Sequence, residues 1–63
     1  MWIVNKYGAF INLDYSTCIF YNEESDRTMC DLRNQERYHL CDGNYVEDII
    51  RNIASGTKIM EVR

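Results

Sequence analysis

A chain of 63 residues with a net charge of -3 leaves room for one domain with a single small hydrophobic core. The hydrophobic fraction of 46% argues against a disordered chain, and the seven basic residues are too scattered to predict direct nucleic-acid binding. No apolar run is long enough to cross a bilayer, and the start of the chain turns polar too soon for a signal peptide. We therefore expect one domain over residues 1–63, located in the cytoplasm and not in a membrane.

The first third of the chain has the two-residue period of β-strands. Residues 2–4 begin a strand, Asn5 and Gly8 suit the turn that follows it, and residues 9–13 alternate apolar and polar side chains. After a short corner, residues 17–22 are rich in β-branched and aromatic residues, which favour strands.

The middle of the chain continues this pattern. Residues 28–33 and 37–41 also alternate, and polar connections separate them from each other and from the preceding strand. The pattern predicts an antiparallel meander of about five short strands.

The period changes to that of a helix between residues 44 and 56. Apolar side chains fall at i, i+3, i+4 and i+7, namely at Val46, Ile49, Ile50 and Ile53. Asn44 can cap the helix with Glu47 as the partner in a capping box, Glu47 can pair with Arg51, and Gly56 suits the stop after Ser55.

Residues 58–62 are apolar enough for a last strand. We expect this strand at a sheet edge, where Lys58, Glu61 and Arg63 discourage further pairing. The predicted fold class is α+β, with a small antiparallel β-meander, one amphipathic helix packed on the sheet and a short C-terminal strand.

The chain has few residues suited to catalysis or metal binding. Cys18, Cys30 and Cys41 are too far apart for a Cys-x-x-Cys chelate, and His39 lies two residues from Cys41, on the same face of the expected strand. The glycines fit no phosphate-binding motif, and no carboxylate pair has a catalytic spacing. We expect reduced thiols, no cofactor, no metal and no enzymatic activity. A Cys3His metal site remains a minor alternative.

A basic turn is a candidate ligand site. Arg33, Arg37 and Tyr38 lie around it, and two guanidinium groups beside an aromatic ring can hold an anion or stack on a base. The alternative interpretation is a solvated turn with a half-buried tyrosine.

The aromatic and aliphatic residues exceed what one small core can hold. The expected core contains the helical stripe together with Ile11, Leu13, Cys18, Phe20, Leu32 and Leu40. The residues left over are Trp2, Phe10, Ile19 and Tyr21, and they cannot all be inside. We therefore expect a partner-binding or self-associating surface, with these candidate residues: Trp2, Phe10, Tyr21, Glu23, Glu24 and Asp26. The acidic residues among them would face a basic partner, and a solvated loop is the alternative.

The opening stretch MWIVNKYGAFINLD resembles a group of very short proteins from phages and prophages of Gram-positive bacteria. Those proteins begin with Met-Trp and an apolar pair, followed by a turn with glycine and an Ile/Val-Asn-Leu-Asp stretch, here Ile11, Asn12, Leu13 and Asp14. The resemblance implies a mobile-element accessory protein and transfers no functional residue. In size and simplicity such proteins are similar to inhibitors of host defence, which implies a bacterial host protein as partner.

These observations predict a non-enzymatic binding protein that acts on another protein and self-associates. An inhibitor of a host defence system, such as a CRISPR-type nuclease, is the class that the resemblance implies. Two alternatives remain. One is an oligomer that binds or sequesters a nucleotide around Arg33, Arg37 and Tyr38, and the other is a structural module with a bound metal.

Overall fold

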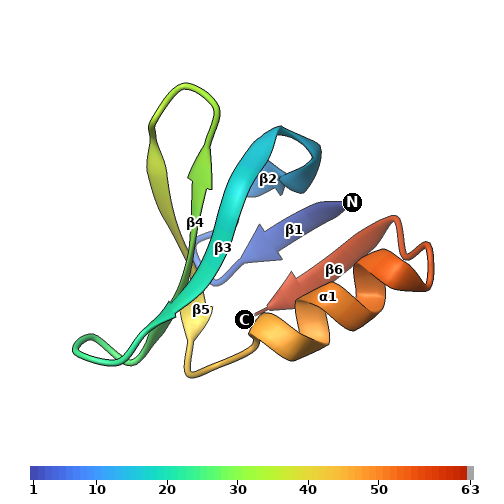
Figure 1. Ribbon diagram of the computed structural model, residues 1–63. Coiled ribbons are helices and arrows are strands. Elements are labelled where there is room, and N and C mark those ends of the chain that lie inside the picture. Colours follow the sequence, from blue (N-terminus) through green and yellow to red (C-terminus); the bar gives the residue numbers. More distant parts are fainter. Residues whose placement is uncertain (63) are drawn as a thin grey trace.

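The computed structural model describes residues 1–62, which form six strands, one α-helix and one short 3-10 helix (Figure 1). In chain order these are β1 (Trp2–Asn5), β2 (Phe10–Asn12), η1 (Leu13–Tyr15), β3 (Ser16–Asn22), β4 (Arg27–Leu32), β5 (Arg37–Asp42), α1 (Val46–Ala54) and β6 (Ile59–Val62). The predicted α+β class is confirmed. Arg63, which we expected to discourage further pairing of the last strand, lies outside the described residues.

The strands form two three-stranded sheets and not one continuous meander. The first sheet has the order β2-β1-β6, and the second has the order β3-β4-β5. β6 lies at a sheet edge, as predicted, but it pairs in parallel with β1. Parallel strands cannot be joined by a tight hairpin, and the chain from β1 to β6 runs through all the other elements, with α1 as the last of them. This pairing joins the two ends of the chain, so local alternation did not predict it.

A β-bulge in β5 changes which side chains reach the core. Met29 pairs with His39 and Thr28 pairs with Cys41, so Leu40 is the extra residue. Leu40 and Cys41 are consequently both buried, and His39 faces the other side of the sheet. The expectation that His39 and Cys41 share one face is therefore wrong.

A second bulge lies at the start of β3. Ser16 pairs with Leu32 and Cys18 pairs with Asp31, which leaves Thr17 unpaired and shifts the alternation of the strand. Ile19 therefore packs against the core, whereas Cys18 is exposed. Cys18 was expected in the core, and the bulge explains why it is not there.

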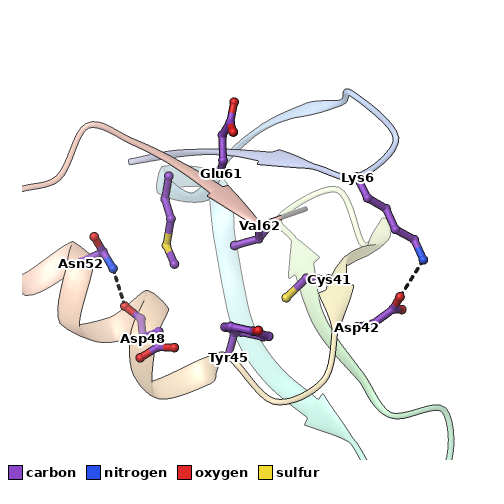
Figure 2. A pocket seen from close by; sticks show the side chains of 9 residues that line it. Lys6, Cys41, Asp42, Tyr45, Asp48, Asn52, Glu61 and Val62 are labelled. Atoms are coloured by element: carbon purple, nitrogen blue, oxygen red, sulfur yellow. Dashed lines mark hydrogen bonds and ion pairs between the residues drawn. The ribbon is translucent and has the colours of Figure 1, made fainter.

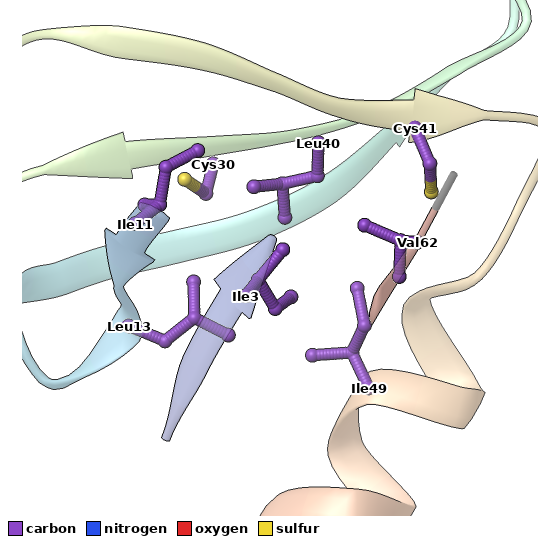
Figure 3. Packing of buried hydrophobic residues seen from close by; sticks show 8 residues of the cluster. All are labelled: Ile3, Ile11, Leu13, Cys30, Leu40, Cys41, Ile49 and Val62. Atoms are coloured by element: carbon purple, nitrogen blue, oxygen red, sulfur yellow. The ribbon is translucent and has the colours of Figure 1, made fainter. Parts of the chain in front are cut away.

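The core lies between the inner faces of the two sheets and one side of α1 (Figure 3). Its buried members are Ile3, Ile11, Leu13, Cys30, Leu40, Cys41, Ile49 and Val62. The prediction is confirmed for Ile11, Leu13 and Leu40. Phe20 and Leu32 are only partly buried.

The helix uses only part of its apolar stripe. Ile49 is fully buried, but Ile50 and Ile53 remain 55% and 46% exposed. These two side chains form what we call the helix flank. The apolar period predicted the helix correctly, but not which part of the stripe the small core would cover.

The ends of α1 differ in part from the prediction. The helix begins one position later than expected, and the Asn44 side chain accepts a 3.3 Å hydrogen bond from the Val46 amide without a capping box. Arg51 forms an ion pair at 3.3 Å with Asp48, three residues before it, and not with the predicted Glu47, four residues before it. The stop is confirmed, because Gly56 follows the helix with a φ of 78°.

Candidate functional site

The outer face of the first sheet carries a group of apolar side chains. Trp2 pairs with Ile59 across β1 and β6, and Val4 pairs with Phe10 across β1 and β2. Directly paired residues point to the same side of a sheet, so these four share one face. Ile3, between Trp2 and Val4, points to the opposite side and is fully buried in the core. We call the outer group the apolar face.

Three members of the apolar face are exposed to solvent. Trp2, Phe10 and Ile59 are 44%, 65% and 59% exposed. Val4 is only 5% exposed although it lies outside the core cluster, which is consistent with cover from its larger neighbours on this face. An exposed apolar group of this kind across adjacent strands is typical of an interaction surface.

Polar residues border the apolar face. Asn12 pairs with Trp2, and Glu61 pairs with Val4, so both side chains belong to the same side of the sheet. Figure 2 shows Glu61 on the opposite side of β6 from Val62, which points toward the core. An apolar centre with polar neighbours matches the usual anatomy of a protein–protein interface.

The remaining predicted partner residues lie on the second sheet. Glu23 and Glu24 are exposed in the turn after β3, and the Tyr21 hydroxyl donates a 2.7 Å hydrogen bond to Asp26. That hydrogen bond raises the pKa of Tyr21. In Figure 1 this turn lies at the far end of the second sheet, away from the strands that carry Trp2 and Phe10. The structure therefore divides the predicted partner residues into two separate groups.

The predicted ligand residues are only partly brought together. Arg33 and Arg37 line one hollow of the second sheet, but Tyr38 is not part of its lining. Tyr38 instead packs against the core, and its hydroxyl donates a hydrogen bond to Glu36. The proposed combination of two guanidinium groups with this aromatic ring is thus not assembled within one chain.

Arg37 is already paired. Its Nε and one terminal nitrogen donate hydrogen bonds of 2.7 and 3.2 Å to the carboxylate of Asp31, and its guanidinium lies 5.0 Å from the centre of the Phe20 ring. The bond from Arg37 lowers the pKa of Asp31, and the same pair raises the pKa of Arg37. Because the carboxylate offsets its charge, Arg37 has little free capacity for an anion.

The sequence did not indicate a pocket of about 350 Å³ that lies between α1 and β6 (Figure 2). Its polar groups are largely engaged with one another. Lys6 Nζ lies 2.7 Å from Asp42, and the Asn52 amide donates a 2.8 Å hydrogen bond to the Asp48 carbonyl. Asp48 also pairs with Arg51. No set of free polar groups converges in the part of this pocket that the structure describes, so it has little to orient a substrate.

The histidine and the thiols are placed for structure. His39 packs edge-on against Tyr7 at 5.8 Å between ring centres, and its Nε2 lies 3.1 Å from Asp42 without hydrogen-bond geometry. Burial raises the pKa of Cys30 to about 11 and also raises that of Cys41. Both thiols are therefore protonated at neutral pH and poor nucleophiles.

Within residues 1–62 no three His, Cys, Asp or Glu side chains are grouped to hold a metal ion, and no helix is long and apolar enough to span a membrane. A scan against protein-family models, a search of curated proteins and a search of solved structures each found no match to this chain.

Proposed function

We propose that this protein acts by binding another protein through the apolar face. The observation that carries the proposal is the exposure of Trp2, Phe10 and Ile59 side by side in the register of three strands. Tryptophan and other aromatic residues contribute much of the binding energy at protein interfaces because they bury a large rigid surface. The fold holds these side chains on strands, which limits the entropy lost on binding.

We propose that the protein has no enzymatic activity. Two observations support this: the buried thiols are protonated, and the polar groups of the α1–β6 pocket are engaged with one another. The expected partner is a bacterial host protein, and inhibition of a defence nuclease is the expected consequence. Both expectations rest on the resemblance of the first quarter of the chain to small phage proteins. A nucleotide-binding oligomer has weaker support, because Asp31 already pairs with Arg37.

A site-specific photo-crosslinking experiment tests the apolar face. A photoreactive phenylalanine analogue is placed at Phe10 in a tagged protein, which is expressed in its host and irradiated. The matched control carries the analogue at Tyr15, which is 57% exposed and lines a hollow with Leu32 and Arg33 at the end of β4, not with the residues of the apolar face. We expect a specific crosslink to a different protein from position 10, and no crosslink to a different protein from position 15.

A double substitution then measures the energy of the contact. Replacing Trp2 and Phe10 with alanine should weaken binding to the crosslinked partner by at least about 30-fold, because interface aromatics commonly contribute more than ~1 kcal/mol each. Tyr15→Ala should leave the affinity unchanged. An unfolding curve for each variant checks that the fold persists. Unchanged affinity in the folded double variant would contradict the proposal.

A further inference from the structure

The edge of the second sheet that β3 forms is unusual within this protein. β3 has seven residues, Ser16–Asn22, and none of them is charged or proline. The other edge strands are less open to pairing, since β2 has three residues, β6 has four and includes Glu61, and β5 begins with Arg37 and ends with Asp42. Long uncharged edge strands favour pairing with a further strand, and soluble proteins usually protect them.

The helix that carries the helix flank lies next to β3. α1 contacts β3, and Figure 1 shows both elements on the same side of the molecule. Ile50 and Ile53 nevertheless remain about half exposed, so the contact with β3 does not cover them. A strand that paired with β3 would bring a second apolar surface to this flank.

The charges at the two ends of β3 are complementary. Arg33 lies beside the start of the strand, since its amide donates a 3.0 Å hydrogen bond to the Tyr15 carbonyl. Glu23 and Glu24 follow directly after the end of the strand. The side chains of these three residues form no ion pair within residues 1–62. In a twofold antiparallel pair, the start of one strand lies opposite the end of the other, so each Arg33 is placed at the end that carries the partner copy's glutamates.

We propose that two copies of this chain pair through β3 in an antiparallel, twofold arrangement, which joins their second sheets into one sheet of six strands. Ile19 is the middle residue of β3 and lies at the centre of this pairing. The seven residues span about 24 Å, and the molecule itself measures 31 × 24 × 21 Å. A standard interface needs about 800 Å² from each partner, less than a fifth of the 4336 Å² accessible surface. The β3 edge supplies the backbone pairing of this interface, and the exposed side chains of the helix flank would add apolar area to it.

Sedimentation equilibrium over a range of protein concentrations tests the pairing. The unmodified chain should sediment with twice its mass of 7.5 kDa. Cys18→Lys and Ile50→Lys, at exposed positions on the edge and on the helix flank, should each weaken the dimer at least about tenfold, because they place charges in the interface. Ile59→Lys is the matched control, since it changes an equally exposed isoleucine on the apolar face. A monomer at all concentrations, or a dimer that only Ile59→Lys disrupts, would overturn the proposal.

Charge reversal tests the antiparallel direction. Arg33→Glu should weaken the dimer about three- to tenfold at low ionic strength, and adding Glu23→Arg and Glu24→Arg to it should restore the affinity. A triple variant no tighter than Arg33→Glu alone would exclude this orientation. The dimer is independent of the proposed partner-binding function, because Trp2→Ala with Phe10→Ala should leave the dimer intact. Failure of either proposal can thus be recognised separately.

Discussion

The side chain of Asn5 joins the two sheets, because its amide nitrogen donates a 3.2 Å hydrogen bond to the carbonyl of His39. Asn5 ends β1 in the first sheet, and His39 lies in β5 of the second. The oxygen of the same side chain accepts hydrogen bonds of 3.1 and 3.0 Å from the amides of Tyr7 and Ala9. One side chain, only 4% exposed, thus holds the β1–β2 turn and the contact between the sheets.

Replacing Asn5 with alanine should therefore destabilise the protein strongly. The substitution leaves two amides and one carbonyl without their partner, and an unsatisfied buried group costs about 1–3 kcal/mol. We expect a loss of about 2–4 kcal/mol in the free energy of unfolding, measured from urea curves. Asn12→Ala is the control, since the Asn12 side chain accepts one hydrogen bond within the described residues, from the exposed Asp14 amide. Equal losses for the two variants would show that Asn5 does not join the sheets.

Thr28 lies in β4, and its side chain anchors the corner between β5 and α1 as that of Asn5 anchors the β1–β2 turn. Its hydroxyl donates a 2.6 Å hydrogen bond to the Gly43 carbonyl and accepts a 2.9 Å bond from the Tyr45 amide, and the residue is fully buried. Thr28→Val keeps the shape and removes both bonds, so we expect a loss of about 1–3 kcal/mol in unfolding free energy. Thr17→Val removes only a 3.3 Å bond at an exposed site and should change it by less than about 0.5 kcal/mol. If Thr28→Val were as mild as Thr17→Val, the hydroxyl would not anchor this corner.

The elements that depend on nearby residues were predicted well from the sequence. The helical period at Val46, Ile49, Ile50 and Ile53 and the stop at Gly56 both correspond to α1. Such signals are local, because a helix closes its hydrogen bonds within four residues. The alternation of the strands was also sufficient to locate them in the chain.

The features that depend on distant pairing were not predictable in this way. The bulges at Thr17 and Leu40 shift the alternation of their strands, and the positions of Cys18 and Cys41 change with them. A shift of one residue moves every following side chain to the opposite face. The candidate site shows the same limit. A surplus of aromatic residues indicated that Trp2 and Phe10 lie outside, but Ile59 joins them only through the parallel pairing of β6 with β1.

The three cysteines should differ sharply in reactivity. Cys18 is exposed, whereas Cys30 and Cys41 lie in the core. With a disulfide reagent at pH 8, and at a protein concentration low enough for the monomer, we expect one thiol per chain to react rapidly and two to react only as the chain unfolds. Cys18→Ser should remove the rapid phase and leave the slow one. Rapid reaction of two or three thiols in the folded protein would contradict the described core.

Two exposed ion pairs should make the free energy of unfolding depend on pH in the acidic range. A hydrogen bond from Arg37 lowers the pKa of Asp31, and one from Lys6 lowers that of Asp42. A carboxyl with a lowered folded pKa stabilises the protein above its unfolded pKa of about 3.9 and loses this effect as the pH falls through the folded value. We expect urea midpoints to be steady from about pH 7 to 5 and to fall below about pH 4.

The double variant Asp31→Asn with Asp42→Asn should be less stable than the unmodified chain at pH 6, with the difference vanishing near pH 2. Glu24→Gln is the control, at a protein concentration low enough for the monomer, because Glu24 is exposed and its carboxylate forms no hydrogen bond or ion pair within residues 1–62. A double variant with the same acid dependence as the unmodified chain would show that neither pair contributes to stability.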